Sequence, residues 1–159
     1  MPSAALIDFE RLDAQRVVAS REEILAKLAQ RGRFALLDGI LRAAGEDGVI
    51  VGFKDIRADD WWASDHIPGR PLFPGVLMCE AAAQLCSYDY LCKATIPAGT
   101  FLGFGGMDGT RFRGVVEPPS RLVIAAKPEK VRSRMFTYSA QAFVDRQLVF
   151  ETQIIGVLV

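Results

Sequence analysis

The chain of 159 residues has the length of one domain, because two domains of half that size would each bury too little surface. Half of its residues are hydrophobic and 24% are charged, which is typical of a globular protein with a substantial core. Its 19 basic residues balance its 19 acidic ones, so the composition argues against a nucleic-acid-binding protein, which needs a basic excess or stripe.

Charged residues interrupt the first twenty positions, so no segment there has the apolar core of a signal peptide. No later apolar run is long enough to span a bilayer. We therefore expect a cytoplasmic protein without a membrane span. Residues 1–19 suggest no role of their own and are treated as an extension of a single domain over residues 20–159.

The capping-box pair Ser20 and Glu23 begins a short apolar periodicity that predicts an amphipathic helix over about residues 21–30. Strands are expected at residues 34–44 and 49–57, on either side of a Gly-Glu-Asp-Gly turn.

Residues 59–74 contain three prolines and are expected to form a loop. The segment from Gly75 to about Lys93 follows, and its apolar side chains surround the helix axis almost completely, which predicts a buried helix. Pro74 can begin that helix without wasting a hydrogen bond.

Several strand-like runs come after the central helix, with Asp145-Arg146 as a hairpin turn. They lie near residues 101–107, 110–116, 121–130, 134–144 and 147–158. One buried helix with strands before and after it, joined by short turns, implies a largely antiparallel sheet wrapped around that helix. The predicted fold class is α+β.

The three cysteines, Cys79, Cys86 and Cys92, fall in the helical segment and form no CxxC pair. The chain has one histidine, too few ligands to complete a zinc site with them. We expect reduced thiols packed as small hydrophobic side chains, and no metal.

Glu80 stands inside the predicted buried helix, where an unpaired carboxylate is strongly unfavourable. Gln84 and Tyr88 follow it at intervals of four residues and share its face. Two interpretations remain open. The row is a structural hydrogen-bond ladder in which Gln84 satisfies Glu80, or Glu80 is a proton donor.

His66 is the only histidine and lies in the proline- and glycine-rich loop. It is either an ordinary surface residue or a general base that the restricted loop holds in one direction. Gly75 is either a turn residue or the donor of a backbone N–H to a thioester carbonyl, since a helix N-terminus favours negative charge and glycine permits close approach.

A base, an acid and a carbonyl-binding N–H together constitute a site for β-elimination. Glu80 is about six residues into the predicted helix, roughly 9 Å from Gly75 along the axis, so His66 is not expected to reach it within one subunit. A symmetric dimer would bring the two residues together from different chains.

The segment HIPGRPLFPGVLMCEAAAQ, residues 66–84, resembles the signature of the FabZ-type 3-hydroxyacyl-[acyl-carrier-protein] dehydratases. The match includes His66, both Pro-Gly pairs, Glu80 and Gln84, and weaker similarity extends over most of the chain from about residue 20.

The resemblance implies a hotdog fold, a homodimer with shared sites, often three such dimers together, and dehydration without a cofactor in fatty-acid or related acyl-chain synthesis. It implies His66 as base, Glu80 of the other subunit as acid and the Gly75 N–H on the carbonyl. Leu72 would orient the histidine through its backbone carbonyl, and Gln84 would support Glu80. The partner would be an acyl carrier protein, for which Arg111 and Arg113 would contribute a basic rim.

The chain departs from the family pattern around the histidine. Asp65 replaces a glycine, Ile67 replaces a phenylalanine, and Asp-Asp-Trp-Trp-Ala over residues 59–63 replaces Asn-Glu-Pro-Phe-Phe. These changes leave His66 and Glu80 intact and bear on the acyl chain length accepted.

Three alternatives remain. A dehydratase that also isomerises the double bond usually has aspartate at the place of Glu80, and thioester hydrolysis fits the motif less well. A non-catalytic protein that binds acyl chains or the carrier has no need of both His66 and Glu80.

Overall fold

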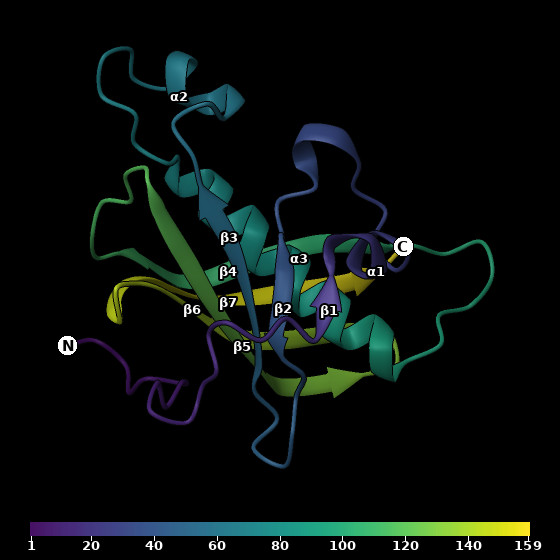
Figure 1. The fold of residues 1–159 in the computed structure, drawn as a ribbon. Coiled ribbons are helices and arrows are strands. Elements are labelled where there is room, and N and C mark those ends of the chain that lie inside the picture. Colours follow the sequence, from purple (N-terminus) through teal and green to yellow (C-terminus); the bar gives the residue numbers. More distant parts are fainter.

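Seven strands form one antiparallel sheet in the computed structural model, which describes residues 1–159 (Figure 1). The strands are β1 (Ala19–Ser20), β2 (Gly39–Arg42), β3 (Ile50–Ile56), β4 (Leu102–Phe112), β5 (Ser120–Arg132), β6 (Met135–Val144) and β7 (Gln147–Leu158). Their order across the sheet is β1-β2-β3-β5-β6-β7-β4, so β4 is an edge strand that pairs with β7 alone.

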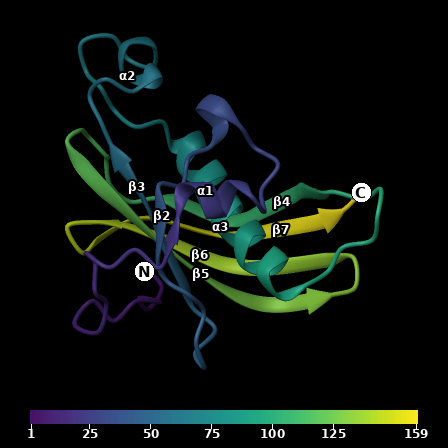
Figure 2. The same cartoon turned by 45° about the vertical axis from the view of Figure 1, so that its right-hand side comes forward.

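The long helix α3 (Gly75–Lys93) lies in the curve of this sheet, and β5, β6 and β7 bend around it in both views (Figures 1 and 2). Two short helices, α1 (Arg21–Leu25) and α2 (Trp61–Asp65), and the 3-10 turn η1 (Gly32–Phe34) complete the fold. A sheet wrapped around one central helix is the hotdog architecture, so the predicted fold class is confirmed. No helix has both the length and the apolar character needed to cross a membrane.

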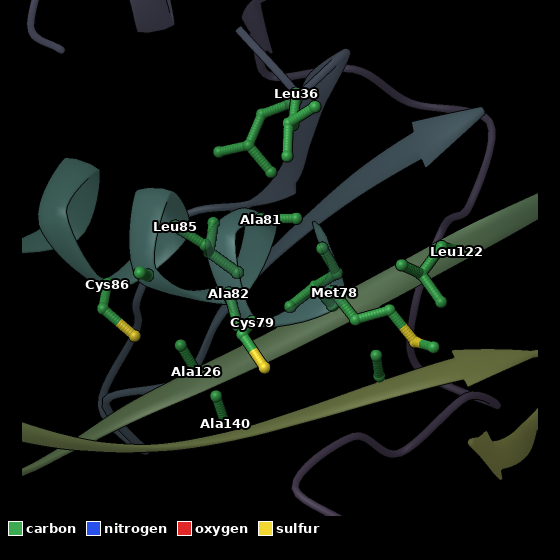
Figure 3. Packing of buried hydrophobic residues seen from close by; sticks show 14 of the residues in the cluster. Leu36, Met78, Cys79, Ala81, Ala82, Leu85, Cys86, Leu122, Ala126 and Ala140 are labelled. Atoms are coloured by element: carbon green, nitrogen blue, oxygen red, sulfur yellow. The ribbon is translucent and has the colours of Figure 1, made fainter. Parts of the chain in front are cut away.

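Small side chains let α3 lie close to the sheet. Ala81 and Ala82 are fully buried on the helix. Figure 3 shows the side chains of Cys79 and Cys86 directed toward the alanines of β5 and β6. Residues buried on all sides of α3 explain why its sequence is apolar around the whole axis.

The N-terminal extension covers part of the outer face of the sheet, the face turned away from α3. Ile7 is buried there in a second apolar cluster with residues of β2, β3, β5 and β6. Phe9 packs edge-on against Phe143 at 5.2 Å between ring centroids. The Gln141 amide accepts from the Leu6 N–H at 2.7 Å and donates to the Ala4 carbonyl at 2.9 Å. Residues 1–19, for which the sequence suggested no role, therefore cover an apolar surface on the outer face of the sheet.

The predictions for the segments before the central helix were partly wrong. The expected helix over residues 21–30 ends at Leu25, although its capping box of Ser20 and Glu23 is present. The expected strand over residues 34–44 is reduced to β2, and residues 59–74 contain the short helix α2.

Predictions after the helix were closer to the structure. The run 101–107 and the start of the run 110–116 form one strand, β4, which ends at Phe112, so the strand predicted up to residue 116 was too long. Two register shifts in β4 fall at Gly105 and Gly109. The hairpin turn at Asp145-Arg146 is confirmed, since both residues have positive φ (47° and 66°), as a two-residue hairpin of the mirror-image type requires.

Candidate active site

His66 follows the last residue of α2 and is exposed in the isolated chain. Its Nδ1 lies 2.8 Å from the carbonyl oxygen of Leu72. Because a carbonyl can only accept, this hydrogen bond requires the proton on Nδ1. In the neutral ring Nε2 is then free to accept a proton, as a general base must.

Glu80 is half-buried on α3, and its Oε1 accepts from the Gln84 amide at 2.8 Å. The same amide nitrogen donates to the Phe34 carbonyl at 2.6 Å, and the Gln84 Oε1 accepts from the Leu36 N–H at 3.1 Å. Both the nitrogen and the oxygen of the Gln84 amide are therefore engaged in hydrogen bonds. Oε2 of Glu80 has no hydrogen-bond partner in the chain, so one carboxyl oxygen remains for another group.

Gly75 is the first residue of α3, behind Pro74. A Cβ added at Gly75 would lie 2.8 Å from Cε1 of Phe112, closer than real contacts allow. The aromatic ring of Phe112 therefore packs against Gly75 so closely that a larger residue would displace it, a contact that the sequence did not predict. The opening N–H groups of a helix have no earlier turn to bond to, so the N–H of Gly75 is a donor for a ligand.

Within one chain, no hydrogen bond joins the His66–Leu72 pair to the Glu80–Gln84 pair. A small cavity of about 40 Å³ opens beside Glu80, with Phe104 and Phe136 among the residues that line it. Large apolar side chains at the start of α3 are exposed, including Val76 (73%) and Phe112 (54%), which contacts Gly75. One chain thus presents two separate hydrogen-bonded pairs, His66–Leu72 and Glu80–Gln84, with exposed apolar side chains nearby.

Tyr88 does not extend the predicted polar row. It forms no hydrogen bond with Gln84. Burial, followed by its contact with the Cys92 thiol, raises the pKa of Tyr88 to about 12. The row therefore ends at Gln84, and the ladder interpretation holds for its first step alone.

The three thiols differ in their surroundings. Cys79 and Cys86 are buried, and burial raises the pKa of both. Cys92 is exposed, so the expectation that all three pack as hydrophobic side chains was wrong for this residue.

The two arginines expected at a basic rim are not equivalent. Arg113 donates from Nε to Glu151 at 2.9 Å and is paired with that carboxylate. Arg111 is exposed, and its one side-chain hydrogen bond is to the neighbouring Thr110 carbonyl. Of the two, only Arg111 lacks a carboxylate partner within the chain.

Comparison with known proteins identifies the family of this chain. A family model described as the FabA-like domain matches residues 28–153. The FabZ 3-hydroxyacyl-[acyl-carrier-protein] dehydratase of Syntrophobacter fumaroxidans is 36% identical over 136 residues, which cover 86% of this chain and 91% of that protein. The FabZ dehydratase of Campylobacter jejuni is 33% identical over 135 residues, 83% of this chain and 92% of that protein.

Solved structures agree on the fold. The dehydratase heterocomplex ApeI:P of Xenorhabdus doucetiae superposes with a TM-score of 0.69 at 14% identity, covering 89% of this chain and 91% of that one. The family model and the sequence relatives above show that the chain belongs to the FabZ-type 3-hydroxyacyl-[acyl-carrier-protein] dehydratase family.

Proposed function

We propose that this protein removes water from a 3-hydroxyacyl chain on an acyl carrier protein, giving the trans-2-enoyl thioester in fatty-acid or related acyl-chain synthesis. The observation that carries the proposal is the hydrogen bond from His66 Nδ1 to the Leu72 carbonyl. It leaves Nε2 as the proton acceptor in a chain that belongs to the dehydratase family.

The elimination uses three groups. His66 Nε2 takes a proton from C2, and the electron pair of that C–H bond forms the C2–C3 double bond. The hydroxyl leaves from C3 with a proton from Glu80, as water. Charge that develops on the thioester oxygen is stabilised by the N–H of Gly75. A proton then passes from the His66 imidazolium to the Glu80 carboxylate, which restores the starting protonation state of both residues.

A second copy of the chain completes the site in this proposal. In support, β4 is an edge strand of 11 residues whose outer side is unpaired, and exposed Phe104 lies on it. A free edge with apolar side chains favours pairing with another chain. Around a two-fold axis the same contact forms twice, so each of two sites would combine one chain's His66 with Glu80 of the other. Three such dimers would form the larger assembly that the family resemblance implies.

The acyl carrier protein and a cytoplasmic location belong to the same proposal. Arg111 would meet the acidic carrier, whereas Arg113 is held by Glu151. Charge reversal at Arg111 should weaken turnover of carrier-linked substrates and leave short pantetheine substrates unaffected. This contribution should shrink with added salt, because exposed charges are screened over about 8–10 Å at physiological ionic strength.

The direct test is incubation of the purified protein with 3-hydroxyacyl and trans-2-enoyl carrier-protein thioesters of several chain lengths. We expect interconversion, followed by absorbance of the enoyl thioester and by mass. His66→Ala should fold normally and lose about 10²–10⁴-fold of the rate. A folded wild-type protein that binds these thioesters without converting them would instead be a carrier-binding protein. A cis-3-enoyl product would reveal additional isomerase activity.

A further inference from the structure

One carboxylate oxygen connects the loop of His66 to the sheet. Oδ2 of Asp60 accepts from the indole N–H of Trp62 at 3.2 Å and from the backbone N–H of Arg57 at 3.3 Å. The ammonium of Lys54 lies 3.7 Å from the same oxygen. Two hydrogen-bond donors and one ammonium group, from β3 and its end and from α2, thus surround one carboxylate oxygen.

The lysine in this group occupies an unusual position. β3 lies inside the sheet, between β2 and β5, and directs Ile50 and Ile56 into the core under α3. Side chains alternate along a strand, so Lys54 is on that same inner face. Lys54 is only 8% exposed, and Asp60 is its ion-pair partner. A buried ammonium is strongly unfavourable without a paired charge, so the position of Asp60 is tightly specified.

Asp60 does not act as an ordinary helix cap. It precedes α2, yet its side chain accepts no hydrogen bond from a backbone N–H in the first turn of that helix. The carboxylate turns toward β3 instead. In Figure 1, α2 lies beyond the end of β3, so the contact holds the helix at the end of the sheet.

Trp62 connects Asp60 to His66. The Trp62 side chain is 1% exposed and packs edge-on against Phe73 at 5.2 Å between ring centroids. The Trp62 carbonyl accepts from the backbone N–H of His66 at 2.9 Å, and Phe73 directly follows Leu72, whose carbonyl holds the imidazole. The exposed loop between His66 and Leu72 is therefore anchored at both ends by one aromatic pair.

We propose that Asp60 is a positioning residue for His66, acting through Lys54 and Trp62. The proposal rests on the assignment of His66 as base. By holding α2 at the end of the sheet, Asp60 keeps the His66 ring at the Leu72 carbonyl, with the proton on Nδ1 and with Nε2 directed to the substrate.

The single histidine makes this directly measurable, because ¹⁵N NMR of the imidazole reports one residue. We expect the wild type to show the Nδ1–H form. In Asp60→Ala the ring should shift toward the Nε2–H form that predominates in free imidazole. In parallel kcat should fall about 10- to 100-fold with little change in KM, the size expected for a small misplacement of a reacting group.

Two further variants separate positioning from folding. Trp62→Phe retains the packing on Phe73 and removes the indole donor, so it should give a smaller change in the same direction. Asp60→Glu keeps the charge and should restore much of the Nδ1–H form. Asp59→Ala is the matched control, because Asp59 is an exposed neighbour that pairs with Arg57 at the surface, and it should match the wild type in both measurements.

The NMR result is independent of the dehydration assay, so failure of the proposed reaction and failure of this inference are distinguishable. A folded Asp60→Ala protein with the wild-type imidazole spectrum overturns the inference, whatever its activity. If Asp60→Ala does not fold, an unchanged spectrum in both Asp60→Asn and Trp62→Phe overturns it equally.

Discussion

Gln84 determines how Glu80 is presented in the structure. Its amide is bonded to the Phe34 carbonyl and to the Leu36 N–H, so it cannot rotate away from Glu80 without breaking contacts to another segment. Glu80 consequently has one oxygen held and one without a partner. This arrangement is compatible with the proposed acid, and it also meets the need of a half-buried carboxylate for a hydrogen-bond donor.

Glu80→Gln separates the two roles. The carbonyl of the substituted side chain can still accept from Gln84, so we expect the thermal midpoint to hold or to rise slightly. The rate should fall by about 10²-fold or more, because an amide cannot protonate the leaving hydroxyl. Circular dichroism melting and the dehydration assay measure both. Lost stability together with unchanged activity per folded molecule would mean that Glu80 is structural.

Thiol reactivity should follow burial along α3. The raised pKa of Cys79 and Cys86 leaves almost no thiolate at neutral pH, whereas Cys92 is accessible. We expect iodoacetamide to label one thiol of the native protein and all three in denaturant, counted by mass spectrometry. Cys92→Ser should remove the native label, and labelling of Cys79 in the native protein would contradict the packing of α3.

Much of the site was predictable from the sequence because its residues are close along the chain. His66, Leu72, Gly75, Glu80 and Gln84 lie within one motif, and the helical spacing placed Gln84 beside Glu80. Phe112 was not found, because its contact with Gly75 joins β4 to the start of α3. Asp60 was noted only as a departure from the family, since its bond to Lys54 depends on how β3 and α2 meet.

At the scale of elements, the segment around residue 36 shows why strand prediction failed. Leu36 and Leu37 are buried, as the apolar pattern indicated. The Leu36 N–H and the Phe34 carbonyl, however, bond to the side chain of Gln84 and not to a neighbouring strand. Apolar patterns predict burial, whereas this hydrogen bonding depends on a residue 48 positions away.

The N-terminal extension is held by charge as well as by apolar contacts. Glu151 on β7 accepts from the Ser3 N–H at 3.2 Å and pairs with Arg113. Burial by itself would raise the pKa of Glu151, but the Arg113 and Ser3 hydrogen bonds outweigh it and hold that pKa below its usual value of 4.5. The folded state therefore favours the charged form.

Glu151→Gln should lower the free energy of unfolding at pH 7 by about 1.5–3 kcal/mol, the range for hydrogen bonds to charged groups. A pKa lowered by folding contributes stability above the unfolded-state value and loses it as pH falls through the folded value. The difference between wild type and variant should therefore shrink below about pH 4.5. Urea unfolding between pH 3 and 8, spanning the carboxyl and neutral ranges, tests this.

Glu10→Gln is the control for this series. Its pair with Arg146 also ties the extension to the sheet, but both side chains are largely exposed. Surface pairs contribute little, so this variant should stay near the wild type at every pH. Equal effects of the two substitutions would show that burial of Glu151 is unimportant.

At the scale of the whole molecule, the proposed shared site predicts complementation. His66→Ala and Glu80→Gln should each be inactive. After the two are dissociated, mixed and reassociated, random exchange makes half of the dimers mixed, and each mixed dimer has one intact site. About a quarter of wild-type activity should return.

Subunit exchange must be verified independently, by mass spectrometry of differently tagged chains. If mixed dimers form and no activity returns, His66 and Glu80 act within one chain. The second copy would then serve only to cover the apolar surface around Val76 and Phe104.

Both chain ends lie beside the free edge strand. Val159 exchanges two backbone hydrogen bonds with Phe101, just before β4 begins, and the Met1 carbonyl accepts from Arg113, just after β4 ends. A purification tag or fusion partner at either terminus would therefore project next to the strand available for pairing. For any study of assembly, removing the tag is part of the experiment, and the exposed turn at Gly45–Gly48, at the far end of β2 and β3, is the better place for a label.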